Sequence, residues 1–390
     1  MSFAGRIAAS IAEIDAGAWD DCLPGEAECH GYYRACDEAA ARSGTGLRCA
    51  AVSVDDGKGV AAVAPFFRFD YRLDTPIQGR LRPMADAVFG RLPGLVTLKV
   101  LCVGSPYAER CHLGFAPRLD AARRQGAARA MITALERQAQ AEGAHLVAFK
   151  DLGPDEDAAL GPLLGAAGFA TLGSLPVAVL DLPFGDENGY LASLSSGTRK
   201  DIRRKLAKAT SVRIEHRSDI AGLENLIGDL YESTRRQSGL DYGDLEVLPP
   251  GYFPAVSRAL GERAVFALYW VGEELAAFNL LLVEPGRVID KFLGMRYPLA
   301  RQHNLYAVSW MANVRFCLAR GIPLLQSGQT AYAAKLRFGS RLVPSTIRFR
   351  HRNAALQWLL GRLSPFLCFA RFDPDLSAFA TRTQVQEKAA

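Results

Sequence analysis

The sequence predicts an α/β (α+β) protein of two similar domains, each a mixed, mostly antiparallel sheet flanked by helices. Its 390 residues far exceed the roughly 150 of a typical domain. Residues 1–180 carry 18 basic and 21 acidic side chains, and the remainder carries 28 and 20. The balance thus changes from −3 to +8, which indicates two domains, the second facing an anionic partner. Both halves also repeat one order of elements: antiparallel strands, then strand, helix, strand, short helix and final strand.

In the first half, apolar periodicity predicts a helix, a hairpin and a strand–helix–strand unit with a closing strand. The predicted segments are a helix at Tyr32–Ala41, hairpin strands at Leu47–Val54 and Gly59–Phe67, an irregular stretch at Asp70–Leu92, a strand at Leu95–Val103, a helix at Ala121–Ala141, a strand at His145–Lys150, a short helix at Ala158–Ala167 and a strand at Ser174–Leu182. Residues 158–180 carry no charge, but their glycines and prolines argue against a membrane-spanning helix.

The polar stretch 183–190 is expected to join the halves. The elements predicted after it are a basic helix at Leu191–Ala209, a strand at Val212–His216, a helix at Ile220–Gln237, strands at Ala264–Val271, Leu275–Val283 and Val288–Met295, a helix at Leu305–Arg320, a strand at Pro323–Gln326, a short helix at Ala331–Phe338 and a strand at Thr346–Arg350. We therefore expect domains at 1–183 and 184–352, and a helical extension and tail at 353–390.

Composition indicates a folded cytoplasmic protein: 49% of residues are apolar and 22% are charged. The N-terminus meets charge too early for a signal peptide. Eight dispersed cysteines do not suit a disulfide scaffold. Cys22, Cys29 and Cys36 are spaced as on one helix face, where core packing is a better expectation than a metal site. No metal centre is expected.

The sharpest local motif is R-x-x-G-x-A at Arg123, Gly126 and Ala128, near the start of a predicted helix. A helix N-terminus presents unpaired N–H groups and a positive dipole end, which suit pyrophosphate. Gly126 would allow close approach of the anion, Ala128 would leave room, and Arg123 would add charge. The alternatives are a basic surface helix, or a helix that begins upstream and uses these amides internally.

With the long helix, the strand HLVAFK and the segment AALGPLLGAAGF, this motif resembles the acyl-CoA-binding core of the GNAT acyltransferases. The resemblance implies that the loop holds the CoA pyrophosphate and that the preceding strand diverges to admit the pantetheine. It also implies acyl-CoA (acetyl-CoA or longer) as co-substrate and no tightly bound cofactor.

Segments of the second half, SLSSGTRKDIRRKLAKA, DKFLGMRYPLARQHNLY and CLARGIPLLQSGQTAYAAKLRFG, resemble the FemAB-like N-acyltransferases. This resemblance spans roughly residues 10–352 and implies a tandem two-domain protein. It places the G-x(5–6)-K pattern at Gly328–Lys335, and it places Arg301, His303 and Asn304 where the pyrophosphate loop would lie. From the residues alone, Asn304 is a better helix cap than a phosphate ligand.

Charged and polar residues of the second half suggest the chemistry. Asp290 and Lys291 interrupt an apolar strand, so strand alternation places one of them inward. Asp290 is a candidate base or amine anchor, with an ion pair as the alternative. Tyr306 could protonate a leaving group or pack in the core.

The segment after Gly328 adds Gln329, Tyr332 and Lys335 to the candidate site. Tyr332 and Lys335 are three apart, so they lie on one helix face. Lys335 could hold a phosphate or stabilise an oxyanion, a solvated lysine being the alternative.

The run from Arg199 to Lys208 has six basic residues and one acid. It predicts a helix with one packed and one cationic face. That face is either ordinary surface or a dock for tRNA, an acyl carrier protein or a phosphorylated substrate. The candidate anion ligands are Arg199, Arg203, Arg204 and Tyr332.

No G-x-S-x-G elbow, Walker motif, HExxH or dinucleotide fingerprint is present. The expected function is transfer of an acyl group from acyl-CoA, or an acyl carrier protein, to a small-molecule amine by direct attack. The alternatives are an aminoacyl-tRNA-dependent transferase and a non-catalytic GNAT-like scaffold. No DNA partner and no transmembrane segment are expected. The apolar tail after Asn353 should dock on the first domain rather than lie on a membrane.

Overall fold

The structure is a computed structural model that describes residues 2–42, 46–72, 87, 97–238, 247–368, 373 and 375–377. The chain divides into two units. Unit 1 consists of Met1–Pro176, Asp241–Pro250 and Pro344–Ala390, and unit 2 consists of Val177–Leu240 and Gly251–Val343. The irregular stretch expected at Asp70–Leu92 lies largely outside the described residues.

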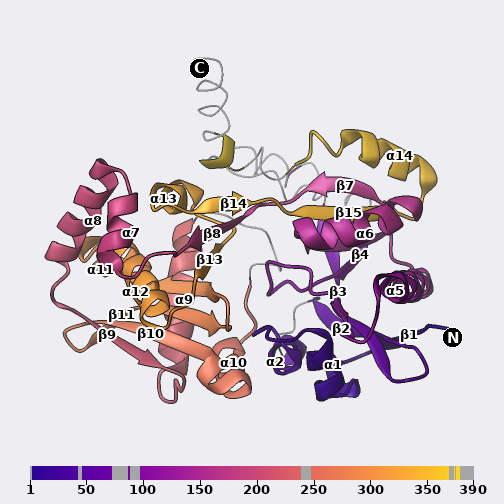
Figure 1. Ribbon diagram of the computed structural model, residues 1–390, viewed down its shortest axis with the longest axis horizontal. Coiled ribbons are helices and arrows are strands. Elements are labelled where there is room, and N and C mark those ends of the chain that lie inside the picture. The colour runs from indigo at the N-terminus through magenta and orange to yellow at the C-terminus, as the bar shows by residue number, and fades with distance from the viewer. Residues whose placement is uncertain are drawn as a thin grey trace. The chain divides into compact units, whose positions relative to one another are not determined.

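Unit 1 is built on a mixed sheet with the strand order β1-β2-β3-β4-β6-β15-β7, and β5 pairs with β3 (Figure 1). Only β4 and β6 are parallel neighbours among these described strands. The strands are β1 (Ala4–Ala8), β2 (Arg48–Asp55), β3 (Val60–Arg72), β4 (Thr97–Val103), β5 (Gly114–Phe115), β6 (Leu146–Leu152), β7 (Ala170–Gly173) and β15 (Thr346–His351).

Helices cover both the sheet and its edges in unit 1. They are α1 (Ala16–Cys22), α2 (His30–Arg42), α5 (Ala121–Ala141), α6 (Pro154–Ala166) and α14 (Ala354–Leu363). One face of the sheet buries Phe67, Val100, Ala148 and Phe349 in a common apolar cluster. Phe349 belongs to β15, and burial of a large apolar side chain stabilises a fold by about 1.5–3 kcal/mol. This packing therefore holds β15 in unit 1.

Unit 2 repeats the plan with the strand order β14-β8-β13-β12-β11-β10-β9. Its strands are β8 (Val177–Asp181), β9 (Val212–Arg217), β10 (Ala264–Val271), β11 (Glu274–Val283), β12 (Val288–Met295), β13 (Leu324–Gly328) and β14 (Arg341–Val343). Its helices are α7 (Glu187–Ser193), α8 (Ser196–Lys208), α9 (Glu224–Ser238), α10 (Tyr252–Leu260), α11 (Leu299–Gln302), α12 (Leu305–Ala319) and α13 (Tyr332–Arg337). The nearly all-apolar α12 is buried along most of its length.

The two sheets confirm the predicted fold class, but each contains a strand expected in the other half. β8 lies beside β13 in unit 2, whereas the sequence suggested that it closes the first domain. β15 occupies the matching place beside β6 in unit 1. The units therefore change at 176/177 and 343/344 instead of the expected 183/184 and 352/353. The sheet to which a strand belongs is decided by its pairing with strands distant in sequence, which the side-chain alternation within one strand does not reveal.

Two local expectations need correction. The predicted helix Leu191–Ala209 is two helices, because Ser195 accepts a hydrogen bond from the Thr198 N–H and begins α8 anew. Cys22, Cys29 and Cys36 are all buried but do not share a helix: Cys22 ends α1, Cys29 precedes α2 and Cys36 lies within α2. All three are free thiols.

Candidate active site

The two parallel strands of unit 2 diverge at their carboxyl ends. β12 and β13 are paired at Val288 with Leu325 and at Ile289 with Gln326, and their ladder ends there. In unit 1, the equivalent strands β4 and β6 are paired at four successive positions, up to Val103 with Phe149. Unit 2 therefore has a stretch of β12 past Ile289 that β13 does not pair, and unit 1 lacks this arrangement among its described strands.

Asp290 lies at the point where this divergence begins. On the other side of β12, Leu281 is opposite Asp290 and Leu280 is opposite Phe292, so Lys291 is an additional residue in the strand. Such a bulge interrupts the alternation of side chains and redirects them. Lys291 is buried and Asp290 is partly buried, so both charges of this strand lie inside the fold.

Side-chain amides hold the Asp290 carboxylate. Asn279 Nδ2 donates to Oδ1 at 2.7 Å, and Asn313 Nδ2 donates to Oδ2 at 3.0 Å. Tyr269 in turn donates its hydroxyl to Asn279 Oδ1 at 3.1 Å. Burial, and then the charge of Asp290, raise the pKa of Tyr269 well above its ordinary value. The same two causes raise the pKa of the Cys317 thiol to about 12. The network thus fixes the orientation of a carboxylate inside the fold.

Asn313 has a second feature. Its side chain is 1% exposed, and its Oδ1 has no hydrogen-bond partner within the described structure. A buried acceptor without a donor is unfavourable by about 1–3 kcal/mol. This oxygen could accept a hydrogen bond from a bound molecule or a water.

The buried Lys335 lies on α13, just after the carboxyl end of β13. It is 6% exposed, and its Nζ donates to the carbonyl oxygen of Ser327. Tyr332 is also fully buried, so the three-residue spacing correctly placed the two on one face. The solvated lysine considered as an alternative is wrong, whereas the anion-binding role of Tyr332 stays a prediction. Gln329 is partly exposed between β13 and α13.

The turn between β12 and α12 holds the remaining candidates. Arg301 is exposed on α11, with its guanidinium carbon 5.5 Å from the centre of the Tyr297 ring. His303 Nδ1 is 3.5 Å from Ser211 Oγ. Asn304 precedes α12 with φ of 53°, but its side chain does not cap the helix. The predicted capping role is therefore wrong for the side chain, although the position is correct.

Tyr306 lies in the first turn of α12 and is half-buried. Its ring stacks on Phe338, with 6.3 Å between the ring centres. Phe338 directly follows α13, so this stacking brings the start of α12 together with the segment that carries Lys335. The Tyr306 side chain is thus packed on Phe338 while part of it stays exposed.

The basic helix α8 divides into bonded and exposed arginines. Arg199 Nη1 lies 3.2–3.4 Å from carbonyl oxygens of Leu191, Ala192 and Leu194, so it caps the end of α7. Its anion-binding role stays a prediction. Arg204 pairs with Asp201 at 2.6 Å on the surface.

Three further basic residues of this helix, Lys200, Arg203 and Lys208, are exposed and have no ion pair in the described part of the chain. These three and Arg204 form the cationic face of α8.

The R-x-x-G-x-A motif of unit 1 has no free helix terminus to offer. Helix α5 begins at Ala121, and Asp120 accepts from the Arg123 N–H at 2.8 Å. Arg123 pairs with the buried Asp56 at 2.6 Å. A Cβ on Gly126 would lie 2.6 Å from the Phe3 ring, and Ala128 is buried in the helix interface. The predicted pyrophosphate loop is wrong here: the helix starts upstream, and carboxylates occupy the anion positions.

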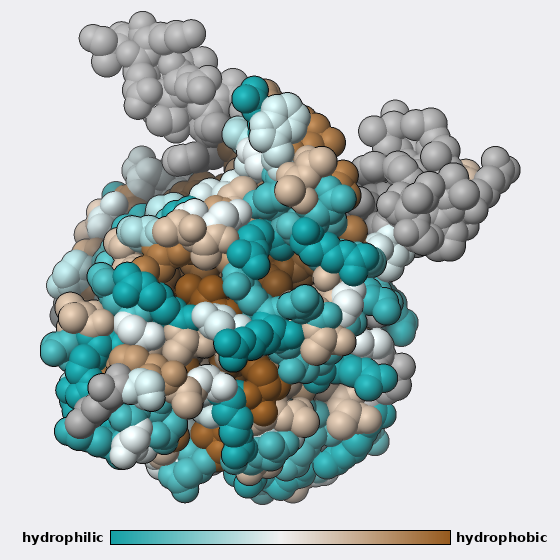
Figure 2. All heavy atoms as spheres, turned by 90° about the vertical axis from the view of Figure 1, so that its right-hand side faces the viewer, coloured by the Kyte–Doolittle hydropathy of each residue, from teal (hydrophilic) through white to brown (hydrophobic). Residues whose placement is uncertain are grey.

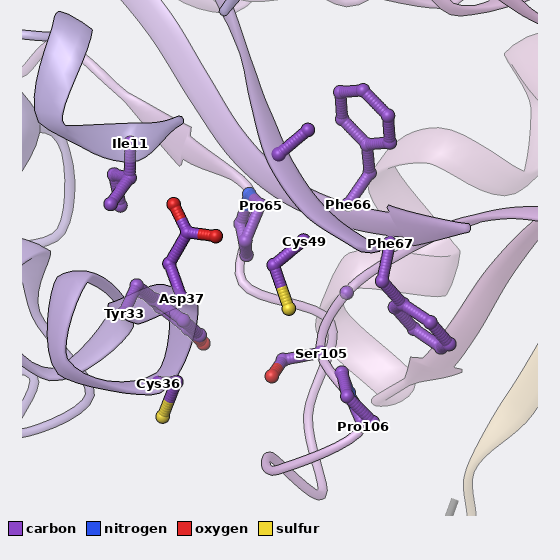
Figure 3. A pocket seen from close by; sticks show the side chains of 12 residues that line it. Ile11, Tyr33, Cys36, Asp37, Cys49, Pro65, Phe66, Phe67, Ser105 and Pro106 are labelled. Atoms are coloured by element: carbon purple, nitrogen blue, oxygen red, sulfur yellow. The ribbon is translucent and has the colours of Figure 1, made fainter. Parts of the chain in front are cut away.

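Unit 1 contains one further pocket of interest, which is too small to hold a substrate. It measures about 10 Å³ and lies among Tyr33, Asp37, Cys49 and Ser105 (Figure 3). That volume suits about one water molecule. Burial raises the pKa of Asp37, and a hydrogen bond from the Ser10 hydroxyl opposes this shift.

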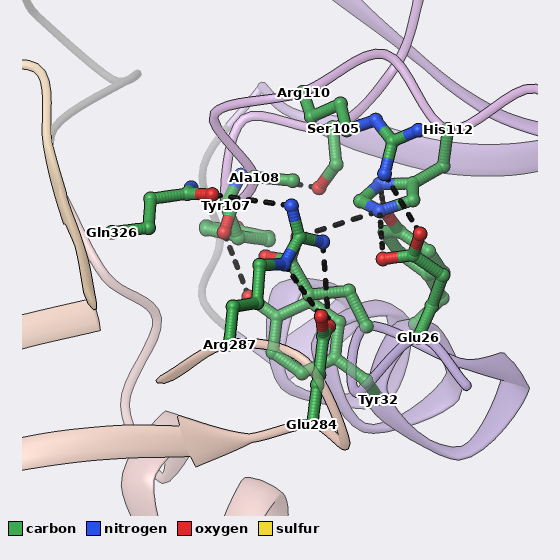
Figure 4. A network of polar contacts seen from close by, with 12 residues as sticks. Glu26, Tyr32, Ser105, Tyr107, Ala108, Arg110, His112, Glu284, Arg287 and Gln326 are labelled. Carbon is green, nitrogen blue, oxygen red and sulfur yellow. Dashed lines mark hydrogen bonds and ion pairs between the residues drawn. The ribbon is translucent and has the colours of Figure 1, made fainter. Parts of the chain in front are cut away.

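Beside this pocket, unit 1 contains a charged cluster around the buried His112. His112 Nδ1 lies 2.7 Å from the Tyr33 hydroxyl, and Arg110 donates to Glu26 at 2.7 Å (Figure 4). Glu28 is 2% exposed. Buried charges of both signs are thus bonded to one another, which is how such groups are tolerated inside a fold.

Unit 2 has a larger groove at the carboxyl end of β12. It measures about 470 Å³ and is lined by Asp229, Glu232, Ser233, Arg236, Gln237 and Tyr297. Its charged lining residues are Asp229, Glu232 and Arg236, and Glu232 is ion-paired with Arg235 at 2.8 Å. A cationic group in the groove would therefore meet the Asp229 carboxylate.

Sequence reasoning missed the side chains that bond to Asp290. Asn279 and Asn313 lie in apolar segments, where a buried amide requires a partner. Their polarity was a signal, but nothing in the spacing linked them to Asp290. In the described residues, no group of three or more His, Cys, Asp or Glu side chains is arranged for a metal ion. No helix within these residues is long and apolar enough to cross a membrane.

Comparisons with known proteins agree with this architecture. Residues 196–362 match the family profile described as an acetyltransferase (GNAT) domain. No curated protein matches the sequence.

Three solved structures are similar in fold. The C-terminal domain of a protein assigned as a lysylphosphatidylglycerol synthetase from Agrobacterium fabrum has a TM-score of 0.53 at 15% identity, covering 90% of this chain and 95% of that one. FemX has a TM-score of 0.50 at 15% identity, covering 81% and 91%. A tandem GNAT protein from the clavulanic acid biosynthesis pathway has a TM-score of 0.50 at 13% identity, covering 90% and 98%.

At these identities the structural matches establish the fold alone, whereas the family profile identifies the domain that contains β12, α12 and β13. Residues 196–362 therefore form a GNAT acetyltransferase domain, and the fold of the chain is similar to those of FemX and of a tandem GNAT protein.

Proposed function

We propose that this chain is an N-acyltransferase whose unit 2 moves an acyl group from acyl-CoA, or from an acyl carrier protein, to a small-molecule amine. The observation that carries the proposal is the divergence of β12 from β13 directly at Asp290. Unpaired backbone along β12 can hydrogen-bond an extended amide chain such as pantetheine, as an added strand would. In unit 1, β4 stays paired with β6 up to the last residue of β4, Val103, which argues for a structural role of that unit.

In the proposed reaction, the amine nitrogen attacks the thioester carbonyl, the new C–N bond forms and the C–S bond breaks. Asp290 takes a proton from the incoming ammonium, directly or through a water, and Asn279 and Asn313 keep its oxygens oriented. Lys335 supports the developing oxyanion, and Tyr306 gives a proton to the departing thiolate. Arg301, His303 and Asn304 are proposed to contact the donor's phosphates. Gln329 would orient the acyl group.

The proposed acceptor site is the groove between α9 and Tyr297. An amine substrate is cationic near neutral pH, so the carboxylate of Asp229 would attract it. We place the reaction in the cytoplasm on the sequence argument from dispersed cysteines.

A second candidate is transfer from an aminoacyl-tRNA, which the FemAB-like resemblance implies. The cationic face of α8 favours it, because Lys200, Arg203 and Lys208 are exposed and available to phosphates. The same face would suit an acidic carrier protein.

Calorimetric titration with acetyl-CoA and a longer acyl-CoA tests the proposal. We expect saturable one-to-one binding that Asp290→Asn retains while it lowers the rate of acyl transfer at least about a hundredfold. Arg123→Gln, in unit 1, is the matched control and should leave both binding and rate unchanged.

Loss of binding in Arg123→Gln alone would place the donor in unit 1 and contradict the proposal. Absence of heat with both thioesters, together with saturable binding of aminoacyl-tRNA or an acyl carrier protein that Arg203→Glu weakens, would replace CoA by that donor. Binding of none of them would favour a non-catalytic scaffold.

A further inference from the structure

Exposed apolar side chains are confined to one short stretch of the described chain. The six large hydrophobic residues that the structure exposes there all lie within twelve positions. They are Leu356 (45% exposed), Trp358 (62%), Leu359 (43%), Leu363 (41%), Phe366 (62%) and Leu367 (44%). A contiguous exposed apolar patch is uncommon on a soluble domain and marks an interaction site. Four of them lie on α14, and Phe366 and Leu367 follow its end. We call the six residues together the apolar face of α14.

The opposite side of α14 is fixed to unit 1, so the exposure is a consequence of how the helix is held. Gln357 donates to the Gly168 carbonyl at 2.9 Å and accepts from the His351 N–H at 2.8 Å. Leu360 packs against the apolar cluster of the sheet. A Cβ on Gly361 would lie 3.5 Å from Ala170 Cβ, in ordinary contact with β7. The helix therefore cannot rotate its apolar face inward without breaking these contacts.

The segment around the apolar face is rich in arginine, and its first acidic residues are Asp373 and Asp375. Residues 344–372 contain five arginines and neither aspartate nor glutamate. Two of the arginines pair within unit 1: Arg348 with Asp157 and Arg350 with Glu136. Arg352 and Arg362 are exposed at the two ends of α14, and the guanidinium carbon of Arg362 lies 4.8 Å from the centre of the Trp358 ring.

The apolar face also stands outward on the molecule. α14 lies at the upper edge of unit 1 in Figure 1, and in Figure 2 brown and pale side chains reach the surface at the same height. Its ten residues span about 15 Å, half of the hydrocarbon thickness of a bilayer. The helix is thus suited to lie along an interface and not to cross it.

We propose that the apolar face of α14 docks on a lipid surface that carries anionic headgroups. An interfacial helix inserts its apolar residues to the level of the acyl chains while arginines meet the phosphates. Tryptophan is favoured at that depth because its ring is apolar and its N–H is polar. The flanking arginines favour a surface that carries anionic groups over a neutral one, and the exposed Trp358 favours the interface of a lipid bilayer. The sequence expectation that this segment docks on the first domain holds for one side of the helix, and the other side remains for the membrane.

Vesicle sedimentation of the full chain tests the inference. We expect binding to vesicles of phosphatidylcholine with one third phosphatidylglycerol, and weaker binding to phosphatidylcholine alone. The double variant Trp358→Glu/Leu363→Glu should weaken binding by at least about tenfold. Arg362→Gln should weaken binding to the anionic vesicles by about fivefold, since one arginine near such a surface contributes about that factor.

The matched control is Thr133→Glu/Gln140→Glu, which adds the same two charges on the exposed side of α5 and should leave binding unchanged. Circular dichroism checks that all variants remain folded. Absence of sedimentation with both vesicles overturns the inference, as does equal loss in the control. A concentration-dependent dimer that the Trp358→Glu/Leu363→Glu change dissolves, without vesicle binding, would assign the face to a second copy and also overturn it. None of these outcomes depends on acyl transfer.

Discussion

Replacing Asn313 by leucine should destabilise unit 2, because it removes one of the two amide donors to Asp290. The two side chains have similar volume, so the change acts on hydrogen bonding more than on packing. A hydrogen bond to a charged group contributes about 1.5–3 kcal/mol. The substitution also removes the buried Asn313 Oδ1, which has no partner in the described structure, and this should recover about 1 kcal/mol. The expected net loss is about 0.5–2 kcal/mol of unfolding free energy.

Urea unfolding at pH 7, followed by tryptophan fluorescence, measures this loss, since Trp310 lies three residues from Asn313 on α12. The exposed Asn225 provides a matched control: Asn225→Leu on α9 should change stability by no more than about 0.5 kcal/mol.

A double-mutant cycle with Asp290→Asn tests the cause. If the loss reflects an under-bonded carboxylate, neutralising position 290 should reduce the effect of Asn313→Leu by at least about 1 kcal/mol. A stabilising Asn313→Leu, or additivity within about 0.5 kcal/mol, would refute the reasoning, because the carboxylate would then not depend on this donor.

Two further predictions concern packing and pH. A Cβ on Gly294 of β12 would overlap the Phe278 ring and lie 2.8 Å from the backbone of α9. Gly294→Ala should therefore lower the unfolding free energy by about 1–3 kcal/mol in the same urea assay. The control Gly286→Ala, whose Cβ would have nothing within 4 Å, should be near neutral. Hydrogen bonds from Lys205 and Arg204 lower the pKa of Asp201 to about 2 from an ordinary 3.8. A carboxylate whose pKa is lower in the folded than in the unfolded chain stabilises the fold at pH values above its unfolded pKa. The difference in unfolding free energy between the parent and Asp201→Asn should therefore be full above about pH 5 and vanish as the pH falls toward 2. An unchanged difference at pH 2 would contradict this prediction.

Much of the fold could be predicted because local patterns determine it. The bounds of β10, β12 and α5 agree with the predictions residue for residue, since alternation and helical periodicity arise within one element. Short edge strands such as β1 and β14 were missed because they carry too few residues for a period. The apparent motif in α5 misled for a different reason: the sequence could not show that Asp56 and Asp120 bond to Arg123, because these contacts form only in the folded chain.

The candidate site was only partly accessible to sequence reasoning. Asp290 stood out, because a charge in an apolar strand requires a partner. Its partners could not be identified, since Asn279 on β11 and Asn313 on α12 meet it only through packing. Lys335 resembled a solvated helix lysine until the fold placed its ammonium against the carbonyl of Ser327.

The sequence by itself determined the class of fold, the duplication, most element bounds and the family resemblance, because these depend on residue type and spacing along the chain. Only the tertiary structure decided which sheet receives β8 and β15, where β12 leaves β13, and which side of α14 stays exposed. Each of these depends on contacts between residues far apart in sequence, whose free energy is fixed by geometry in three dimensions and leaves no period in the chain.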